Sequence, residues 1–347
     1  MKTTAAILVE TGRPLEIDQL EVPALKPGQV LVEIKFSGVC HTQILEARGH
    51  RGKDNFLPHC LGHEGAGVIL EIGPAVSRVK TGDRVLLSWI KGPGMDIPGT
   101  VYGWKGKSVN AGAIATFSQL AVISENRTTK LPENIEFAHG ALMGCAVPTG
   151  LGAVFNNAEP KPGQSLAVFG AGGVGLCAIA GAAIAGCTPV IAVDINPQKF
   201  EAARAAGATH CVNPSEGDLL QQLNKLCPQG LDFAIEATGR PEIMEKALQA
   251  VRPLSGAAVL IGNAHFGENL SLDPRQFNAG KQLRGSWGGG TVPERDFPRY
   301  FSLLSAGRLN LDLLSATRYA LSDANRALDD LESGKVLRPL LDMQLSM

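Results

Sequence analysis

The stretch from Ser165 to Val193 contains no charged residue, and it constrains the fold of this chain more than any other segment. Its length alone would allow a helix to cross a lipid bilayer. Six glycines and Pro189 interrupt it at short intervals, however. The stretch therefore divides into a strand, a glycine turn, a helix, a second turn and a second strand. We predict this unit and no membrane span.

The glycines of this stretch form a G-x-G-x-x-G motif, Gly170-Ala171-Gly172-Gly173-Val174-Gly175, between an apolar strand and an alanine-rich helix. Such a motif alone is a weak signal, but its place between strand and helix is the one that dinucleotide-binding proteins use. The glycines let the backbone turn tightly and approach a pyrophosphate at the helix N-terminus. The motif therefore predicts a dinucleotide cofactor.

Asp194 ends the second strand, 19 residues beyond Gly175. An acidic residue near this spacing hydrogen-bonds the adenosine ribose, and it repels a 2′-phosphate. We therefore predict NAD rather than NADP, with Lys199 within reach of the same ribose. The alternative for Asp194 is a helix N-cap.

The chain changes pattern along its length. Its 347 residues exceed a single ordinary core, so two domains are expected. The first third contains short β-branched runs separated by Pro and Gly, whereas apolar strands alternate with helical segments from Ser165 to about Gly290. That alternation predicts a parallel sheet covered on both faces. Residues 91–112 are rich in Gly and Pro and predict a long irregular loop, and "DANRALDDLESG" predicts a helix.

Composition excludes several classes of partner. The net charge is −1 with no basic block, which gives no support for binding nucleic acid or an anionic membrane. The N-terminus lacks the apolar core and cleavage site of a signal peptide. Seven cysteines without a regular spacing predict free or metal-bound thiols in a reducing compartment. We therefore expect a cytoplasmic location.

Several side chains of types that bind metals occur in the first half of the chain. A Lewis acid would activate an alcohol or carbonyl oxygen for hydride transfer, and catalytic zinc usually has three protein ligands and one open position. Spacing alone cannot choose among the candidates, and a buried cysteine is often a packing residue. The candidates are Cys40, His41, His59, Cys60, His63, Glu64 and Cys145.

Motifs along nearly the whole chain resemble the zinc-dependent alcohol dehydrogenases of the medium-chain dehydrogenase/reductase superfamily. The similarity is greatest to the branch of liver-type and glutathione-dependent formaldehyde dehydrogenases. The motifs that carry it are "GVCHT", "GHEGAGVI", "GDRV", "TFSQ", "MGCAVPTGLGAV", "VFGAGGVG", "VDINPQKFEAARAAGATHCVNP" and "SGKVLRPLL".

This resemblance implies an α/β protein with two domains. Residues 1–147 and 291–347 would form a GroES-like, β-rich catalytic domain, and residues 148–290 a Rossmann domain with a doubly wound parallel sheet. It also implies Cys40, His63 and Cys145 as the ligands of a catalytic zinc.

The resemblance implies further roles around the zinc. Glu64 would lie behind the metal as an exchange ligand, and Thr42 would take the alcohol proton. His41 and Arg338 would contact the cofactor pyrophosphate. The resemblance places Thr149, Ile261, Asn263 and Trp287 at the nicotinamide, although Asn263 and Trp287 have packing as an alternative. Trp89 and Ala111 would line the substrate pocket. His59 and Cys60 would be wall or packing residues.

The chain departs from the family pattern at three places. The region after "GDRV" lacks the four cysteines that hold a structural zinc in relatives, so we predict one zinc per chain. Tetrameric relatives often associate through this cysteine-containing lobe. Because the lobe is missing here, we predict a homodimer through the edge of the Rossmann sheet rather than a tetramer. Leu45 replaces a histidine that often ends the proton relay. Gln43 replaces an aspartate that often supports the zinc-bound histidine, and its carbonyl oxygen would accept that hydrogen bond.

The predicted function is hydride transfer between NAD and an alcohol larger or more polar than ethanol, giving an aldehyde or ketone, or the reverse reaction. Three alternatives stay open at this stage. They are a glutathione-dependent formaldehyde dehydrogenase, a zinc-free quinone or enoyl reductase, and a dinucleotide-binding protein without enzymatic activity.

Overall fold

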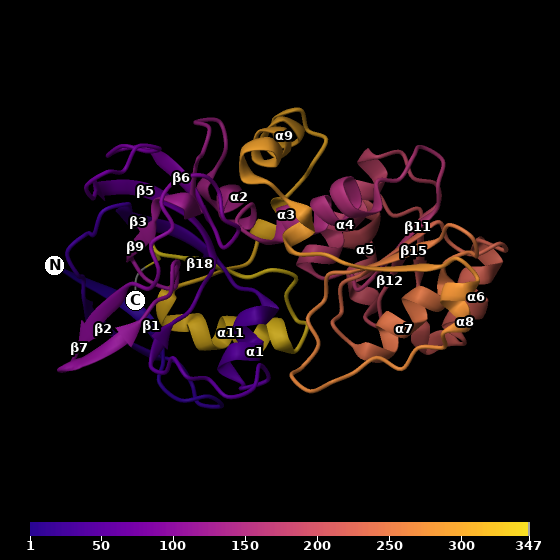
Figure 1. Cartoon of the computed structure of the whole chain (residues 1–347), viewed down its shortest axis with the longest axis horizontal. Helices are drawn as coiled ribbons and strands as arrows, with labels where there is room; N and C mark the ends of the chain where they lie inside the picture. Colours follow the sequence, from indigo (N-terminus) through magenta and orange to yellow (C-terminus); the bar gives the residue numbers. More distant parts are fainter. Residues whose placement is uncertain (346–347) are drawn as a thin grey trace. The chain divides into compact units, whose positions relative to one another are not determined.

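A computed structural model describes residues 1–345, which divide into two compact units (Figure 1). The first unit contains residues 1–145, 292–306 and 311–345, and the second contains residues 146–291 and 307–310. No helix in the described part of the chain is long and apolar enough to cross a membrane.

The first unit is built on β-structure. Its β-branched runs form a closed barrel and a second, mixed sheet. The barrel strands, in spatial order, are β1 (Lys2–Leu8), β2 (Glu16–Glu21), β7 (Val101–Trp104), β8 (Lys107–Asn110) and β4 (His59–Cys60). The mixed sheet has the order β10 (Thr128–Lys130), β6 (Arg84–Ser88), β5 (Glu64–Ile72), β3 (Gln29–Gly38), β18 (Leu340–Asp342) and β17 (Arg318–Tyr319), with β9 (Leu120–Ser124) also paired to β3.

The prediction of an irregular loop over residues 91–112 was wrong for its second half, which is the β7–β8 hairpin. Lys105 and Gly106 form its turn with positive φ values of 49° and 76°, the geometry of a two-residue hairpin turn. Tyr102 pairs with Val109, and both side chains are buried with Trp104 in the barrel interior. The alternation of these apolar residues around a Lys-Gly turn was the signal for strands.

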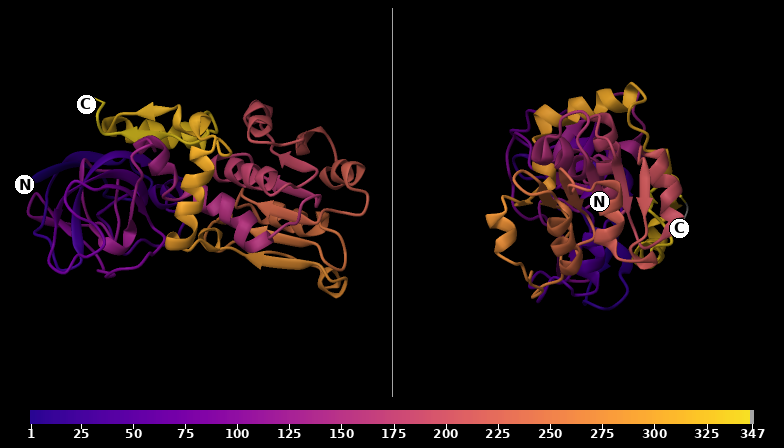
Figure 2. Two further views of the ribbon diagram at one scale, coloured as in Figure 1. Left: turned by 90° about the horizontal axis from the view of Figure 1, so that it is seen from above. Right: turned by 90° about the vertical axis from the view of Figure 1, so that its right-hand side faces the viewer.

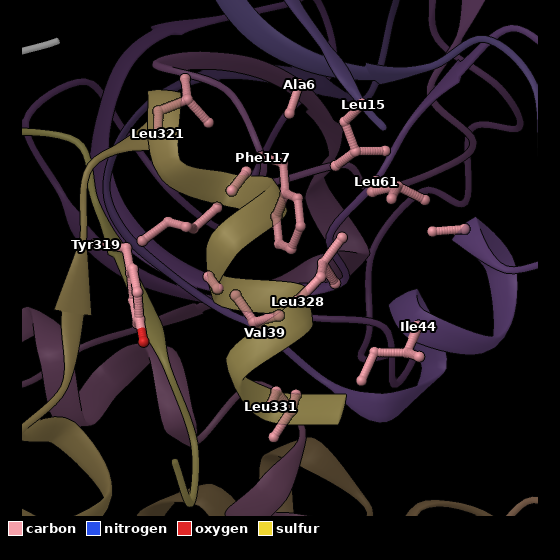
Figure 3. Close-up of a cluster of buried hydrophobic side chains, with 14 of the residues drawn as sticks. Ala6, Leu15, Val39, Ile44, Leu61, Phe117, Tyr319, Leu321, Leu328 and Leu331 are labelled. Atoms are coloured by element: carbon pink, nitrogen blue, oxygen red, sulfur yellow. The ribbon is translucent and has the colours of Figure 1, made fainter. Parts of the chain in front are cut away.

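One hydrophobic cluster of the first unit packs two segments that lie next to candidate metal ligands in the sequence (Figure 3). One segment adjoins Cys40 and the other precedes His63. Ile44 from α1 and Leu61 share this cluster with Leu328 and Leu331 from α11. A fully buried leucine or isoleucine stabilises a fold by about 1.5–3 kcal/mol. The cluster therefore fixes α1 and the chain before His63 against one shared core. The helices of this unit are α1 (His41–Ala47), α2 (Phe137–Leu142), α9 (Pro293–Ser305), α10 (Asp312–Ser315) and α11 (Ala324–Glu332).

The second unit has a parallel sheet, as the alternation of strands and helices predicts. Its spatial order is β13 (His210–Val212), β12 (Val190–Val193), β11 (Leu166–Phe169), β14 (Phe233–Glu236), β15 (Ala257–Leu260) and β16 (Gln282–Gly285). This is the doubly wound order 3-2-1-4-5-6. The uncharged stretch forms β11, α4 and β12 of this sheet, which confirms the predicted strand–turn–helix–strand unit.

Helices cover both faces of this sheet (Figure 1, Figure 2). Val168 lies under α4, while Ala167 and Phe169 share a cluster with Leu223 from α6 and Leu248 from α7. Because side chains alternate along a strand, the two sets lie on opposite faces. The helices are α3 (Ala146–Gly152), α4 (Gly173–Ile184), α5 (Phe200–Ala205), α6 (Leu219–Leu226), α7 (Pro241–Ala250) and α8 (Arg275–Asn278). Shorter helical turns in the two units are η1 (Glu125–Arg127), η2 (Ala153–Ala158), η3 (Pro197–Lys199), η4 (Pro214–Glu216), η5 (Gly288–Gly290) and η6 (Leu321–Asp323).

Candidate metal centre and cofactor site

Cys40, His63 and Cys145 lie together in the first unit although they are far apart in the sequence. Their ligand atoms all lie within 4.8 Å of one another, and the His63 Nε2 atom is 3.3 Å from the Cys145 Sγ atom. Within residues 1–345, no other group of three Cys, His, Asp or Glu side chains converges in this way. Two thiols and one imidazole are a donor set that suits a tetrahedral zinc ion with one position open.

Close backbone packing places Cys145 at this centre. A side chain at Gly144 would overlap the Leu87 carbonyl oxygen and the backbone of Glu64, so glycine is required there. The Ser88 hydroxyl donates a 2.7 Å hydrogen bond to the Gly144 carbonyl oxygen. These contacts hold the residue before Cys145 against β5 and β6.

The two thiols have opposite electrostatic environments. The Cys145 thiol donates to the Cys40 sulfur and lowers the pKa of Cys40 well below its usual range, with the Arg338 charge acting in the same direction against burial. The same hydrogen bond, together with burial, raises the pKa of Cys145. Burial opposes charge on His63, but hydrogen bonding to the Cys40 thiolate and its negative charge raise the pKa of that imidazole. Cys40 is therefore the thiol that deprotonates first.

Gln43 holds a different position from the one the sequence predicts. Its Oε1 atom accepts the Cys40 backbone N–H at 3.0 Å, so the carbonyl oxygen caps α1 instead of facing His63. Its Nε2 atom lies 2.6 Å from His63 Nδ1. A neutral histidine that binds metal through Nε2 carries its proton on Nδ1 and needs an acceptor there. The amide of Gln43 can therefore satisfy Cys40 or a zinc-bound His63, but not both.

Glu64 and Arg338 form a buried ion pair behind the three ligands. Arg338 Nη2 contacts Glu64 Oε1, and the two side chains are 3% and 0% exposed. The other carboxylate oxygen, Oε2, has no hydrogen-bond partner among residues 1–345. Burial raises the pKa of Glu64, while the Arg338 charge opposes that shift. Arg338 uses Nη2 for Glu64, while its Nε has no hydrogen-bond partner among residues 1–345, so the guanidinium keeps donors for a further ligand.

Two more predicted residues lie at the metal centre. The Thr42 hydroxyl is 3.7 Å from the Cys40 sulfur. The Trp89 ring stands edge-on to the His63 ring, with 6.4 Å between their centroids. His41 is exposed at the start of α1. The structure thus brings Thr42 and Trp89 to the three ligands.

A cavity of about 450 Å³ in the first unit reaches the metal centre through His63 and Gln43. Ala111 lines it, as do His59 and Cys60, which fits the prediction that these two are wall residues. Its wall also includes residues 51–54 and Phe56, which the sequence analysis did not single out. Their only signal was the group of charges in "RGHRGKDNF", between two candidate ligands.

The glycine motif of the second unit forms an open cradle at the N-terminus of α4. Gly170 has a positive φ of 99°, and a side chain at Gly175 would overlap the Gly170 carbonyl oxygen. A side chain at Gly172 would meet nothing within 4 Å, so space lies above the turn. Gly172 is the N-cap of α4 and provides no side-chain cap. Free N–H groups facing open space suit a phosphate.

The remaining residues predicted to contact the cofactor occupy the same unit. The buried Asp194 carboxylate accepts the Ala171 N–H at 2.8 Å and the Lys199 ammonium at 3.2 Å, so it lies beside the glycine turn. Ile261 and Asn263 follow β15, and Trp287 follows β16; both strands end at the carboxyl edge of the parallel sheet. The Thr149 hydroxyl is buried without a hydrogen-bond partner in the described part of the chain. An unpaired buried hydroxyl is costly, so a ligand that it could bind fits this position.

Comparisons with known proteins identify two domains along this chain. Residues 26–133 match the alcohol dehydrogenase GroES-like domain, and residues 173–306 match the zinc-binding dehydrogenase family. The S-(hydroxymethyl)glutathione dehydrogenase of Synechocystis is 33% identical over 98% of this chain and 100% of its own length. The enzyme of the same name from Escherichia coli O1:K1 is 34% identical with the same coverage.

A solved structure is similar over the whole chain. Benzyl alcohol dehydrogenase from Acinetobacter calcoaceticus has a TM-score of 0.88 and 28% identity, and the match covers 99% of both chains. The domain matches and the full-length relatives together show the family. The chain therefore belongs to the zinc-dependent alcohol dehydrogenases of the medium-chain dehydrogenase/reductase superfamily, and it is an oxidoreductase with a GroES-like domain and a Rossmann-type domain.

Proposed function

We propose that this protein holds one catalytic zinc ion on Cys40, His63 and Cys145 and uses NAD to interconvert an alcohol with an aldehyde or ketone. The convergence of these three side chains carries the proposal. Bound zinc would supply a Lewis acid that polarises the substrate oxygen, and NAD would accept or return the hydride. The remaining chemistry falls to side chains of this protein.

Thr42 is the proton acceptor in this proposal. Its hydroxyl lies beside the Cys40 sulfur, where it would accept a proton from a substrate hydroxyl held at this centre. Leu45, in the next turn of α1, has no group that takes a proton, so the proton leaves Thr42 by water or by the cofactor ribose. Trp89 excludes water from one side of His63.

The choice of NAD rests on Asp194. Its carboxylate lies beside the glycine turn and would accept from a ribose 2′-hydroxyl, whereas a 2′-phosphate would meet like charge. Lys199 reduces this repulsion but is already paired with Asp194. His41, Thr149, Ile261, Asn263, Trp287 and Arg338 stay proposed cofactor contacts.

We propose one zinc per chain because the segment after "GDRV" has no cysteine, and hydrogen bonds hold its backbone. Buried Glu125 accepts the Met95 N–H at 2.9 Å through Oε1 and the Ser77 N–H at 3.1 Å through Oε2. The Ser124 hydroxyl donates to the Met95 carbonyl oxygen at 2.8 Å and accepts the Ile97 N–H at 2.9 Å. These hydrogen bonds fasten residues 95–97 where a metal-binding lobe would otherwise stabilise the chain.

We propose an alcohol larger or more polar than ethanol as the substrate, because a cavity of about 450 Å³ adjoins His63. A glutathione adduct is the second candidate, because the curated relatives are named S-(hydroxymethyl)glutathione dehydrogenases. The missing cysteine lobe and Leu45 distinguish this chain from that branch.

Turnover with zinc-loaded protein tests the function. Alcohols should reduce NAD, and aldehydes or ketones should oxidise NADH, with ethanol a poor substrate by kcat/KM. A formaldehyde reaction that requires glutathione would instead favour the second candidate. Absence of turnover with every alcohol, aldehyde and ketone would contradict the proposal.

The same proposal gives residues 1–147 and 291–347 to the catalytic domain and residues 148–290 to the Rossmann domain. It also includes a cytoplasmic location and a homodimer. The dimer would form through β16, which ends the order of the parallel sheet and leaves one edge of that sheet unpaired among the described strands. Light scattering with a mass of two chains supports the dimer, and a mass of four chains contradicts it.

A further inference from the structure

The cavity that reaches His63 has a wall rich in charged side chains, all from residues 46–59. Glu46, Arg51, Lys53 and Asp54 line it together with His59. The balance between paired and unpaired charges decides which kind of ligand this wall favours.

Both carboxylates of the wall already have partners. Glu46 Oε1 is 2.6 Å from Arg51 Nη1. Asp54 Oδ2 is 2.8 Å from His59 Nε2, and its other oxygen accepts the Phe56 N–H at 2.8 Å. His59 Nδ1 faces the Cys60 carbonyl oxygen at 3.1 Å. A cationic ligand would therefore share each acid with a partner that is already in place.

Lys53 differs from these residues. It is exposed at the cavity, and it has no hydrogen bond or ion pair with any residue between 1 and 345. Arg51 uses one guanidinium nitrogen for Glu46, and its side chain is 57% exposed. Lys53 is therefore the charged side chain of this wall without a hydrogen-bond partner among residues 1–345, and its ammonium offers three N–H donors.

Apolar side chains line another part of the same cavity. Leu61 is buried, Ile114 is half-buried, and Phe56 is 69% exposed although it is a large hydrophobic residue. The Phe56 backbone is fixed, because its carbonyl oxygen accepts the Asn110 amide at 2.7 Å. The cavity thus combines an apolar surface with one uncommitted cation, at a wall that also includes a candidate zinc ligand.

We propose that the substrate is an alcohol or aldehyde with an apolar body and a carboxylate at the end remote from the reacting oxygen, and that Lys53 binds this carboxylate. This inference rests on the proposed function, because it takes the metal centre as the place of reaction. A single uncommitted ammonium matches a single negative charge. An ion pair that stays partly exposed changes an equilibrium by about 1.5- to fivefold, so Lys53 selects among substrates without deciding whether reaction occurs.

Three probes of one shape test the proposal: 4-(hydroxymethyl)benzoate, benzyl alcohol and 4-(aminomethyl)benzyl alcohol. The wild-type holoenzyme should give kcat/KM in that descending order, with about 1.5- to fivefold between the anionic and neutral probes at low salt. Higher ionic strength should reduce this ratio because exposed charges are screened.

Lys53→Glu should lower the ratio of the anionic to the neutral probe by about two- to thirtyfold, because attraction becomes repulsion of similar size. The matched control is Lys107→Glu, which makes the same charge change on an exposed lysine of β8 that does not line the cavity, and it should keep the wild-type ratio. Zinc content and thermal unfolding should match the wild type for both variants.

Two results would overturn the inference, and they differ in what else they refute. If benzyl alcohol reacts but the carboxylate has no advantage, or if both lysine variants change the ratio equally, the Lys53 subsite is wrong and the proposed function stands. If neither these probes nor any other alcohol, aldehyde or ketone reacts with zinc-loaded protein, the proposed function fails and this inference fails with it.

Discussion

Replacing Gln43 with alanine should weaken zinc binding about ten- to a hundredfold, the usual effect of removing a partner that orients a metal-bound histidine. Gln43 is 1% exposed, so water does not easily take its place. Its side chain has two hydrogen bonds, one of 3.0 Å with the Cys40 backbone N–H and one of 2.6 Å with His63 Nδ1. It therefore links the start of α1, at Cys40, to the His63 ring. An unpaired buried polar group costs about 1–3 kcal/mol, which corresponds to this range of affinity.

Gln43→Glu should act in the opposite direction. A carboxylate has two acceptor oxygens, so it can accept from the Cys40 N–H and from a His63 Nδ1–H at the same time. One recovered charge-assisted hydrogen bond contributes about 1.5 kcal/mol, or about tenfold in zinc affinity. The wild-type glutamine can satisfy only one of these donors when zinc is bound.

Competition with a chromogenic chelator measures the zinc affinity of the three proteins directly. The visible spectrum of the cobalt-substituted forms reports the geometry of the site independently of activity. The expected order of affinity is Gln43→Glu above wild type above Gln43→Ala. Equal affinity of the wild type and Gln43→Ala, with both proteins folded, would refute the reasoning.

Three further predictions concern other parts of the chain. Asp194→Ala should raise the ratio of NADP to NAD use, measured as kcat/KM, by about tenfold or more because a repelling charge is removed; an unchanged ratio would contradict the ribose assignment. Burial raises the pKa of Cys60 from 9.0 to about 12, so its neutral thiol stabilises the fold below pH 9 and that contribution is lost as the pH rises toward 12. The free energy of unfolding, measured with urea, should therefore fall between pH 8 and pH 10.5 by about 2 kcal/mol more in the wild type than in Cys60→Ala. An equal pH dependence of the two proteins would contradict this. Glu125→Gln should lower the free energy of unfolding by about 2 kcal/mol while the zinc content stays the same. Three backbone N–H groups donate to the carboxylate, and a carboxamide would turn an NH2 group toward at least one of them. Loss of zinc would instead show that this segment supports the metal centre.

The sequence predicts most of the fold because its signals are local. The uncharged stretch with its glycines is sufficient to predict β11, α4 and β12, since Gly170, Gly175 and Gly186 each meet a steric need that other residues do not. The β7–β8 hairpin was missed because its strands have four residues each, and glycine and lysine occupy much of the segment. Short strands in a barrel depend on partners distant in sequence, and composition does not reveal those partners.

The metal centre could be predicted only through family resemblance, because its residues are 23 positions or more apart along the chain: Cys40, His63 and Cys145. Spacing left seven candidates open, and folding decides which side chains converge. The orientation of Gln43 was predicted wrongly for a related reason. The Cys40 N–H at the start of α1 competes for the same carbonyl oxygen, and that competition exists only once the helix has formed.

The zinc content of purified wild type, His63→Ala and Cys60→Ser tests the central claim most directly. Both replaced residues come from "PHCLGHEG", and both line the same cavity, so the pair separates a metal ligand from a wall residue. Elemental analysis should find one zinc per chain in the wild type and in Cys60→Ser, and none in His63→Ala. Equal zinc loss in both variants, or two zinc ions per wild-type chain, would contradict the account.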